Sequence, residues 1–109
     1  MPADCVFCKI AADLANHKDV IDEGSYTFVI PDINPVSPGH ALVITKRHYK
    51  NFSSTPDEAL EEVAVMAKRY ALSVKEKDSR VKGFNYVSNE GKEAKQVVFH
   101  LHLHVIPRY

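Results

Sequence analysis

The apolar positions between residues 55 and 77 repeat about every 3.6 residues, which is the period of an α-helix. They form one stripe: Leu60, Val63, Ala67, Tyr70, Ala71 and Val74. Thr55 and Glu58 fit a capping box, and Pro56 fits the first position of a helix. We therefore predict a long amphipathic helix over residues 56–77 that buries one face against the rest of the fold.

Four other segments are rich in β-branched and aromatic residues and are bounded by Pro, Gly, Asn or Asp, which predicts strands. These strands span residues 25–30, 40–45, 83–88 and 97–106. The last two would form a hairpin around residues 89–91, and the alanine-containing segment 8–14 favours a shorter helix. This order predicts an α+β fold in which a mostly antiparallel sheet lies with one face under the long helix.

The composition describes one globular domain over residues 1–109, without repeats or linkers. The 14 basic and 14 acidic residues balance, so we expect neither nucleic acid nor an anionic membrane as a partner. The longest apolar runs are far shorter than the roughly 20 residues of a membrane-spanning helix. The first residues, Met1 to Cys5, lack the basic and apolar segments of a secretory signal, so we expect a cytoplasmic protein.

Three histidines alternate with apolar residues in the segment 99–106. Because successive side chains of a strand point to opposite faces, His100, His102 and His104 would share one face. The opposite, core face would carry Phe99, Leu101, Leu103 and Val105. An isolated histidine in a strand usually has no chemical role, but three in register predict a common purpose.

The spacing of these imidazoles limits what they can bind. At a rise of about 3.3 Å per residue, neighbouring imidazoles lie about 6.6 Å apart and the outer two about 13 Å apart. Zinc holds its nitrogen ligands at about 2.0 to 2.1 Å, so a straight strand cannot offer all three to one ion. A row of neutral imidazoles instead suits acyl or phosphoryl transfer, since imidazole is nucleophilic near neutral pH. His102, in the middle, is best placed to attack.

The two cysteines, Cys5 and Cys8, are too few for a disulfide framework. A redox dithiol usually follows a strand, and the few residues before Cys5 cannot form one. A tetrahedral zinc site would need two further ligands, for which histidines are the strong candidates. A pair of reduced cysteines without a metal is the alternative.

The segment His100-Leu101-His102-Leu103-His104-Val105-Ile106 resembles, at every position, the signature of the histidine triad (HIT) nucleotide hydrolases and transferases, in which three histidines alternate with apolar residues. Other segments are similar to landmarks of this family in the same order: 5–10, 31–33, 38–40, 46–48, 89–91, Gln96 and 107–109. The resemblance covers essentially the whole chain and implies a single HIT domain. The nearest branch is that of the histidine triad nucleotide-binding proteins, which include zinc-carrying bacterial members.

The resemblance implies a role for each residue of the motif. His102 matches the nucleophile that attacks the α-phosphorus of a nucleotide, and water then hydrolyses the nucleotidyl-histidine. His100 and His104 match residues that contact phosphate and assist the leaving group. Other matches are Asp32 for the ribose hydroxyls, Ile33 for the base, and Asn89 with the backbone around Gln96 and Val97 for phosphate. Without the resemblance, Asp32 would be interpreted as a turn residue.

The implied activity is hydrolysis or transfer at the α-phosphate of purine nucleoside phosphoramidates or related nucleotidyl conjugates, with no cofactor required for the chemistry. In zinc-carrying relatives the matching ligands are Cys5, Cys8, His48 and His100. The zinc is implied to be structural, holding His100 so that His102 is oriented, with His40 nearby. The family also implies a homodimer in which the long helix and a sheet edge pair across a two-fold axis. His17 is interpreted as a surface residue.

Two features depart from the family pattern. Many relatives have glycine before and serine after Gln96, where this chain has Lys95 and Val97. The missing hydroxyl predicts an altered leaving-group preference, and Lys95 would either hinder close approach or add a cation for a polyphosphate. The chain also ends at Tyr109, whereas relatives commonly continue for some tens of residues, which weakens any prediction of substrate specificity.

Two other functions remain open from the sequence. A nucleotide-binding regulatory protein with little turnover would use the same pocket, and Lys95 and Val97 motivate this alternative. In the second alternative, the protein is an interaction module stabilised by zinc, and the histidine triad has no catalytic role. Turnover through an adduct, nucleotide binding without turnover, and no nucleotide binding would distinguish the three.

Overall fold

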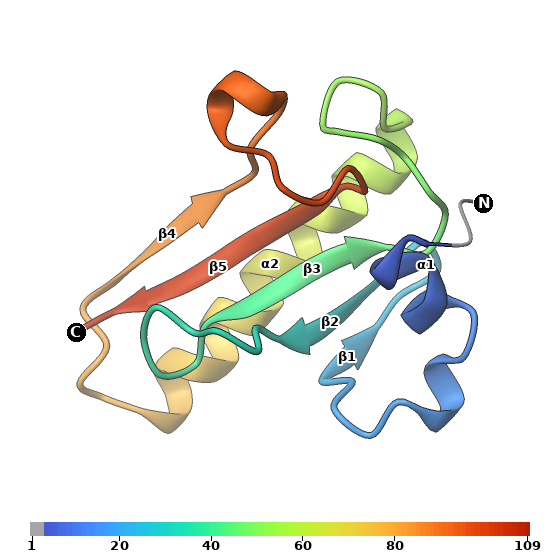
Figure 1. The fold of residues 1–109 in the computed structure, drawn as a ribbon. Helices are drawn as coiled ribbons and strands as arrows, with labels where there is room; N and C mark the ends of the chain where they lie inside the picture. The colour runs from blue at the N-terminus through green and yellow to red at the C-terminus, as the bar shows by residue number, and fades with distance from the viewer. Residues whose placement is uncertain (1–3) are drawn as a thin grey trace.

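The long amphipathic helix is present as α2 (Asp57–Lys77), and it crosses one face of a five-stranded sheet (Figure 1). The computed structural model describes residues 4–109. Its other elements are α1 (Val6–Ala11), the 3₁₀ turn η1 (Leu14–Asn16), β1 (Asp22–Glu23), β2 (Thr27–Pro31), β3 (Ala41–Thr45), β4 (Gly83–Val87), the 3₁₀ turn η2 (Lys92–Ala94) and β5 (His102–Arg108). The predicted α+β fold, with one long and one short helix, is confirmed.

The sheet is antiparallel throughout, in the order β1-β2-β3-β5-β4. The central strand β3 pairs with β5 so that Val43 lies opposite Leu103 and Ile44 lies opposite His102. At the far edge, Val87 of β4 lies opposite His104. The strand that carries the histidines is therefore fixed by a neighbour on each side.

Both faces of the sheet are covered, by layers of unequal extent. α2 lies behind the sheet in Figure 1 and buries Val63, Met66, Ala67 and Ala71 against Val29, Ala41, Val43, Leu101 and Val105. The shorter α1 lies in front, where Phe7 packs with Phe28, Ile30, Leu42 and Ile44. All five residues of β3 are buried as a result. Removal of these apolar side chains from water is the main favourable contribution to folding.

The start of α2 differs from the predicted capping box. Pro56 is the N-cap rather than the first helical residue, and it offers no side-chain hydrogen bond. The Thr55 hydroxyl donates to the Asn51 carbonyl at 2.7 Å, and the Glu58 carboxylate accepts from the Tyr26 hydroxyl at 3.2 Å. Because both polar side chains have partners outside the helix, the capping box does not form.

Several boundaries also differ from the prediction. β5 begins at His102 rather than at residue 97, because the Leu101 amide donates to the Tyr49 carbonyl at 2.7 Å and the preceding residues bend. Phe99 is therefore not on the core face and is 39% exposed. α1 and η1 replace the helix predicted over residues 8–14. The last two strands pair antiparallel as predicted, but a longer loop that contains η2 joins them in place of a turn at 89–91. The short polar strand β1 was not predicted.

Two predictions concern membranes and secretion. Within residues 4–109, no helix is both long and apolar enough to cross a membrane. The prediction about a secretory signal rests partly on Met1, Pro2 and Ala3, which lie outside the described residues.

A single carboxylate ties α2 to the turn before β2. Glu62 accepts from the amides of Ser25 and Tyr26 at 3.0 and 2.8 Å and from the Thr27 hydroxyl at 2.5 Å. Burial raises the pKa of Glu62, but these hydrogen bonds outweigh burial and lower the pKa overall. The resulting stabilisation is complete above the pKa of glutamate in the unfolded chain, and it is lost as the pH falls through the folded-state pKa.

We expect Glu62→Gln to lower the free energy of unfolding by about 1 to 2 kcal/mol at neutral pH, because hydrogen bonds to a charged acceptor are lost. The difference in free energy of unfolding between variant and parent should shrink in acid, because the Glu62 carboxylate of the parent is then protonated and neutral. Urea denaturation at neutral and acidic pH measures both effects. Glu61→Gln, an exposed neighbour on the same helix, is the control, and a loss that is independent of pH would contradict this account.

Candidate active site and metal centre

The histidine motif is divided between two places. His102 and His104 lie on β5 with their ring centroids 5.2 Å apart, and they face away from α2. Leu101 and Val105 lie in the α2 core, as the alternation predicted. His100 precedes the strand and is completely buried beside the N-terminal segment. The three imidazoles therefore do not form the straight row that was expected.

In its neutral form His102 has one free ring nitrogen. Its Nδ1 lies 2.8 Å from the His100 carbonyl oxygen, and because a carbonyl only accepts, Nδ1 carries the proton and donates it. Nε2 is then left with an unshared electron pair. Phe7 contacts the ring edge-on, with centroids 5.1 Å apart, and restricts its rotation. His102 thus has the tautomer that a nitrogen nucleophile needs.

A second chain of hydrogen bonds sets the tautomer of His104. The Val36 amide donates to Nδ1 of the buried His40 at 3.0 Å, so the neutral His40 ring carries its proton on Nε2. That Nε2 lies 2.9 Å from His104 Nδ1 and 3.3 Å from Asp32 Oδ2. His104 Nδ1 accepts from His40, which places the proton of His104 on Nε2. His104 therefore presents an N–H where His102 presents a lone pair.

The charge state of the His40–His104 pair reflects opposing effects. Burial lowers the pKa of both rings, and the neighbouring imidazoles lower the pKa of His104 further. The Asp32 carboxylate, with Oδ2 at 3.6 Å from His104 Nδ1, raises the pKa of both. The pair is thus neutral at rest but has an anion ready to stabilise an added proton. The prediction that His40 lies near the metal ligands is wrong, since it contacts His104 instead.

Both strand histidines line a cavity of about 610 Å³ on the sheet face that α1 covers only in part. Its lining combines apolar residues, which include Phe7, Ile10, Ile30, Ile33 and Leu42, with polar ones, which include Asp32, Asn89, Lys95, Gln96, His102 and His104. All five residues predicted to bind nucleotide line this cavity: Asp32, Ile33, Asn89, Gln96 and Val97. Its size is typical of small-molecule sites, and its mixed lining suits an amphipathic ligand.

Gln96 contributes to this cavity through its backbone. Its buried side chain accepts from the Gly91 amide at 2.9 Å and donates to the carbonyls of Lys50 and Val98 at 2.7 and 3.2 Å. The side chain therefore pins the loop after η2, and the polar groups of its amide are already satisfied by the protein. The Asn89 amide is held only at 3.5 Å from the Lys95 carbonyl, so a ligand can compete for it.

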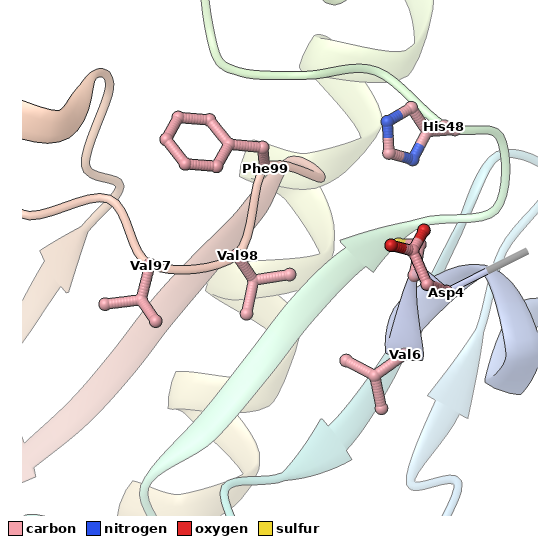
Figure 2. A pocket seen from close by; sticks show the side chains of 7 residues that line it. Asp4, Val6, His48, Val97, Val98 and Phe99 are labelled. Carbon is pink, nitrogen blue, oxygen red and sulfur yellow. The ribbon is translucent and has the colours of Figure 1, made fainter. Parts of the chain in front are cut away.

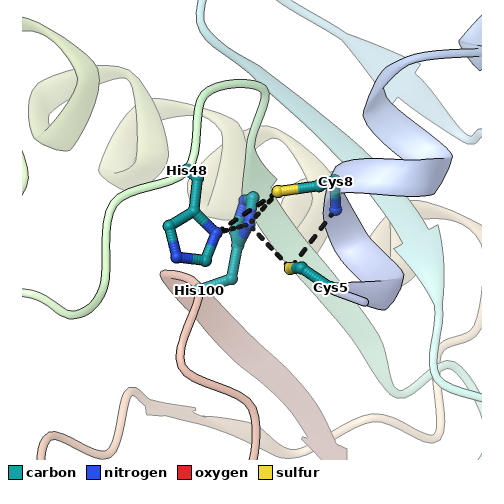
Figure 3. Close-up of side chains that lie close together, drawn as sticks. All are labelled: Cys5, Cys8, His48 and His100. Carbon is teal, nitrogen blue, oxygen red and sulfur yellow. Dashed lines mark hydrogen bonds between the residues drawn. The ribbon is translucent and has the colours of Figure 1, made fainter. Parts of the chain in front are cut away.

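Cys5, Cys8, His48 and His100 form a second cluster beside the cavity (Figure 3). His48 Nδ1 lies 3.2 Å from His100 Nδ1, and the Cys8 sulfur lies 3.3 Å from the former and 3.5 Å from the latter. A tetrahedral zinc ion with ordinary bond lengths separates its ligand atoms by about 3.3 to 3.8 Å. The four predicted ligands are thus brought together at distances that suit one zinc ion.

The protonation states of this cluster also favour a cation. His100 Nε2 lies 2.7 Å from the Thr45 carbonyl and must donate to it, which leaves Nδ1 unprotonated in the neutral ring. Burial, together with the neighbouring Cys5, raises the pKa of the Cys8 thiol to about 11. A bound divalent cation would reverse this effect, because it stabilises the thiolate.

A smaller hollow of about 410 Å³ adjoins the metal cluster (Figure 2). Its lining residues are Asp4, Cys5, Val6, His48, Val97, Val98 and Phe99. Since Cys5 and His48 form part of its wall, the cluster has a path by which a metal ion can enter from solvent.

Two residues that shape the site were not predicted from the sequence, Phe7 and Thr45. Phe7 packs its ring against both His100 and His102, with centroids 5.8 and 5.1 Å away. The carbonyl of Thr45 sets the tautomer of His100. Neither has a chemical signature in the sequence, because an apolar ring and a backbone oxygen act here only through the tertiary fold. His17, predicted as a surface residue, is half-buried and outside both clusters.

Known proteins share both the sequence and the fold of this chain. The family model described as HIT domain matches residues 14–109. The chain is 38% identical over 109 residues to adenosine 5'-monophosphoramidase HNT1 of Saccharomyces cerevisiae. The aligned region covers 99% of this chain and 65% of the yeast protein. A Zn-bound histidine triad family protein from Mycobacterium smegmatis is 39% identical with a TM-score of 0.88, over 97% of this chain and 76% of that one. A HIT family protein from Bacillus anthracis has a TM-score of 0.89 at 34% identity, over 100% of this chain and 76% of that one.

We expect the purified protein to carry close to one zinc ion per chain, and Cys8→Ser to lose it because a hydroxyl is a poor substitute for a thiolate ligand. Elemental mass spectrometry measures the metal, and thermal denaturation with and without a chelator measures its effect. Chelation should lower the melting temperature of the parent but not that of Cys8→Ser. His17→Gln is the control and should keep the metal. A parent that loses its metal without any change in melting temperature would contradict a structural role.

Proposed function

Because the chain belongs to the HIT domain family, we propose that it is a nucleotide hydrolase or transferase that reacts at the α-phosphate of its substrate. The proposed substrates are purine nucleoside phosphoramidates or related nucleotidyl conjugates, in line with the name of the yeast relative. The observation that carries this proposal is the pair of tautomers on β5. His102 offers a lone pair and His104 offers an N–H at the same cavity.

The mixed lining of the cavity suits the apolar base and the polar sugar and phosphate of a nucleotide. A purine would lie among the apolar side chains, which include Phe7, Ile30 and Ile33. Asp32 precedes Ile33 in the chain and lies close to His40 and His104. Each oxygen of a carboxylate can accept more than one hydrogen bond. Asp32 can therefore accept from ribose hydroxyls while it keeps its contacts with the Asn34 amide and His40. The α-phosphate would then lie in front of His102.

In the first step, His102 Nε2 attacks the α-phosphorus and forms a phosphorus–nitrogen bond. The ring becomes positively charged, and its Nδ1–H, which donates to the His100 carbonyl, keeps the charge stabilised. Donors around the phosphate, including His104 Nε2–H and backbone amides near Gln96, stabilise the charge that develops on its oxygens.

An amine leaving group must gain a proton as its bond to phosphorus breaks. The His40–His104 pair, neutral in the free protein, takes up one proton from solvent when the anionic substrate binds, because Asp32 and the phosphate stabilise its protonated form, and it passes this proton to the amine. In the second step water attacks the phosphorus, the bond to His102 breaks and a nucleoside monophosphate leaves. The proton released by water returns to the pair, and the cycle closes without a cofactor in the chemistry.

The metal cluster has a supporting role in this proposal. Zinc, when bound by Cys5, Cys8, His48 and His100, would neutralise the thiolates and fix the His100 ring. Fixing His100 also fixes its carbonyl, which is the hydrogen-bond acceptor for His102. We therefore assign the zinc a structural function that orients the nucleophile.

We also propose that the protein forms a homodimer through the β4 edge and α2. β4 is an edge strand, so its outer backbone groups are free to pair with another strand. Tyr86 and Val87 on β4, and Val65 and Leu72 on α2, are large apolar residues that are exposed in the single chain. Pairing across a two-fold axis would cover them and extend the sheet.

We expect the parent protein to release AMP from adenosine 5′-phosphoramidate, and His102→Ala to be slower by on the order of 10³-fold or more, because the nucleophile is lost. Chromatography of the product measures the rate, and mass spectrometry of rapidly quenched parent should detect an adenylylated histidine. His17→Gln is the matched control. A His102→Ala variant with parental activity would exclude the proposed intermediate.

The same samples distinguish the alternatives. Tight binding of AMP without turnover by the parent would favour a nucleotide-binding regulatory protein. Failure to bind any nucleotide would favour an interaction module in which the histidines are incidental.

We expect light scattering to give a mass of about twice the 12.3 kDa of one chain, because two β4 edges pair. Tyr86→Glu should shift the mass toward the single-chain value, since a buried unpaired charge opposes association. Ile21→Glu, at an exposed apolar position near the opposite edge of the sheet, is the control. A parent mass near 12.3 kDa would contradict the dimer.

A further inference from the structure

Lys95 has a backbone conformation that normally belongs to glycine. Within residues 4–109 it is the one non-glycine residue with a positive φ, at 68°. Its amide donates to the Lys92 carbonyl at 3.0 Å, and the next amide, of Gln96, donates to the Gly91 carbonyl at 3.0 Å. This pattern ends a helical turn with a left-handed residue, a position where glycine is favoured because it has no Cβ. Lys95 thus occupies a position whose backbone conformation disfavours any residue with a Cβ. This cost suggests that its side chain has a role.

Lys95 lines the same cavity as the two strand histidines, His102 and His104, and is exposed to solvent. Among the described residues that line the cavity, it is the one lysine or arginine. The one carboxylate of the lining, that of Asp32, faces His40 and His104. No ion pair within residues 4–109 involves Lys95, so its charge is available to a ligand.

The direction of the reaction leads the leaving group toward this charge. In a displacement at phosphorus, the attacking and leaving atoms lie on opposite sides. His102 attacks from the sheet, which is the floor of the cavity, so the leaving group points toward the mouth. The exposed lining residues define that mouth: Ile33 at 92% exposed, Val97 at 86% exposed, and Lys95.

We propose that Lys95 selects substrates whose leaving group departs as a phosphate or polyphosphate anion over substrates that release a neutral amine. This inference rests on the proposed reaction at His102. For such a nucleotidyl anhydride, His102 Nε2 forms the bond to the α-phosphorus while the bond to the bridging oxygen breaks. The electron pair stays on the departing phosphate, which needs no proton, and the Lys95 ammonium stabilises the developing negative charge. Water then cleaves the phosphorus–nitrogen bond and yields the nucleoside monophosphate and a proton.

An amine leaving group makes a different demand on the site. It needs a proton, which the His40–His104 pair can hold, and it develops no negative charge for Lys95 to stabilise. Lys95 therefore affects the two substrate classes unequally. The ratio of their kcat/KM values isolates this effect from any general loss of activity.

The test compares diadenosine tetraphosphate with adenosine 5′-phosphoramidate in the full chain. Lys95→Gln should lower the ratio of kcat/KM for diadenosine tetraphosphate to kcat/KM for adenosine 5′-phosphoramidate by about tenfold. This effect of an exposed lysine is well below that of an arginine that contacts the transferred phosphoryl group. Lys95→Arg should keep most of the parental ratio, because it keeps the charge. Lys95→Gly, which relieves the backbone, should lower the ratio as Lys95→Gln does. Lys92→Gln removes a charge from the same turn outside the cavity lining, and it should leave the ratio unchanged.

A binding experiment separates this inference from the reaction itself. In the His102→Ala background, ADP should bind more tightly than AMP, and Lys95→Gln should reduce that preference. If the parent turns over neither substrate but this preference depends on Lys95, the proposed reaction fails and the anion subsite stands. An unchanged kcat/KM ratio in Lys95→Gln, a Lys95→Gly variant with the parental ratio, or an ADP preference that is independent of Lys95 would overturn the inference.

Discussion

His100 joins the metal cluster to the reactive centre, and the rest of the site depends on it. Its Nδ1 faces the cysteines and His48, its Nε2 donates to the Thr45 carbonyl, and its own carbonyl accepts from His102. The residue is completely buried, so each of these groups needs its partner within the protein. A shift of this one backbone segment would alter the metal geometry and the tautomer of His102 together. The two functions of the motif are thus coupled through a single peptide.

The cavity exists because the sheet is covered unequally on its two faces. The 21-residue α2 covers one face along its length, whereas the six-residue α1 covers part of the other. The uncovered part of the second face is the floor of the cavity, where His102 and His104 lie. The short helix contributes Phe7 and the turn that carries Cys5 and Cys8, and it leaves room for a ligand beside it. The larger layer buries more apolar residues against the sheet.

The period of the apolar residues predicted the features of the fold that depend on side-chain burial. It failed where a backbone group forms a hydrogen bond with a residue that is remote in the sequence. The stripe of α2 and the inward face of β5 at Leu101 and Val105 follow directly from apolar spacing. The late start of β5 depends on the carbonyl of Tyr49, which is remote in sequence. The structure brings together each of the two groups of residues that the resemblance named, those of the metal cluster and those of the cavity, but it separates His40 from the first group. Only the pairing of β3 with β5 brings His40 to His104.

Gln96 separates the residues proposed for the reaction from those proposed for substrate selectivity. Its buried amide is fully used in holding the loop between η2 and β5, so the backbone of that loop has a fixed position above the histidines. The flanking residues Lys95 and Val97 line the cavity and are exposed to solvent. They can change without disturbing the tautomers of His102 and His104. The proposed selection by Lys95 therefore concerns the leaving group and leaves the nucleophile intact, so the same fold would serve substrates with different leaving groups.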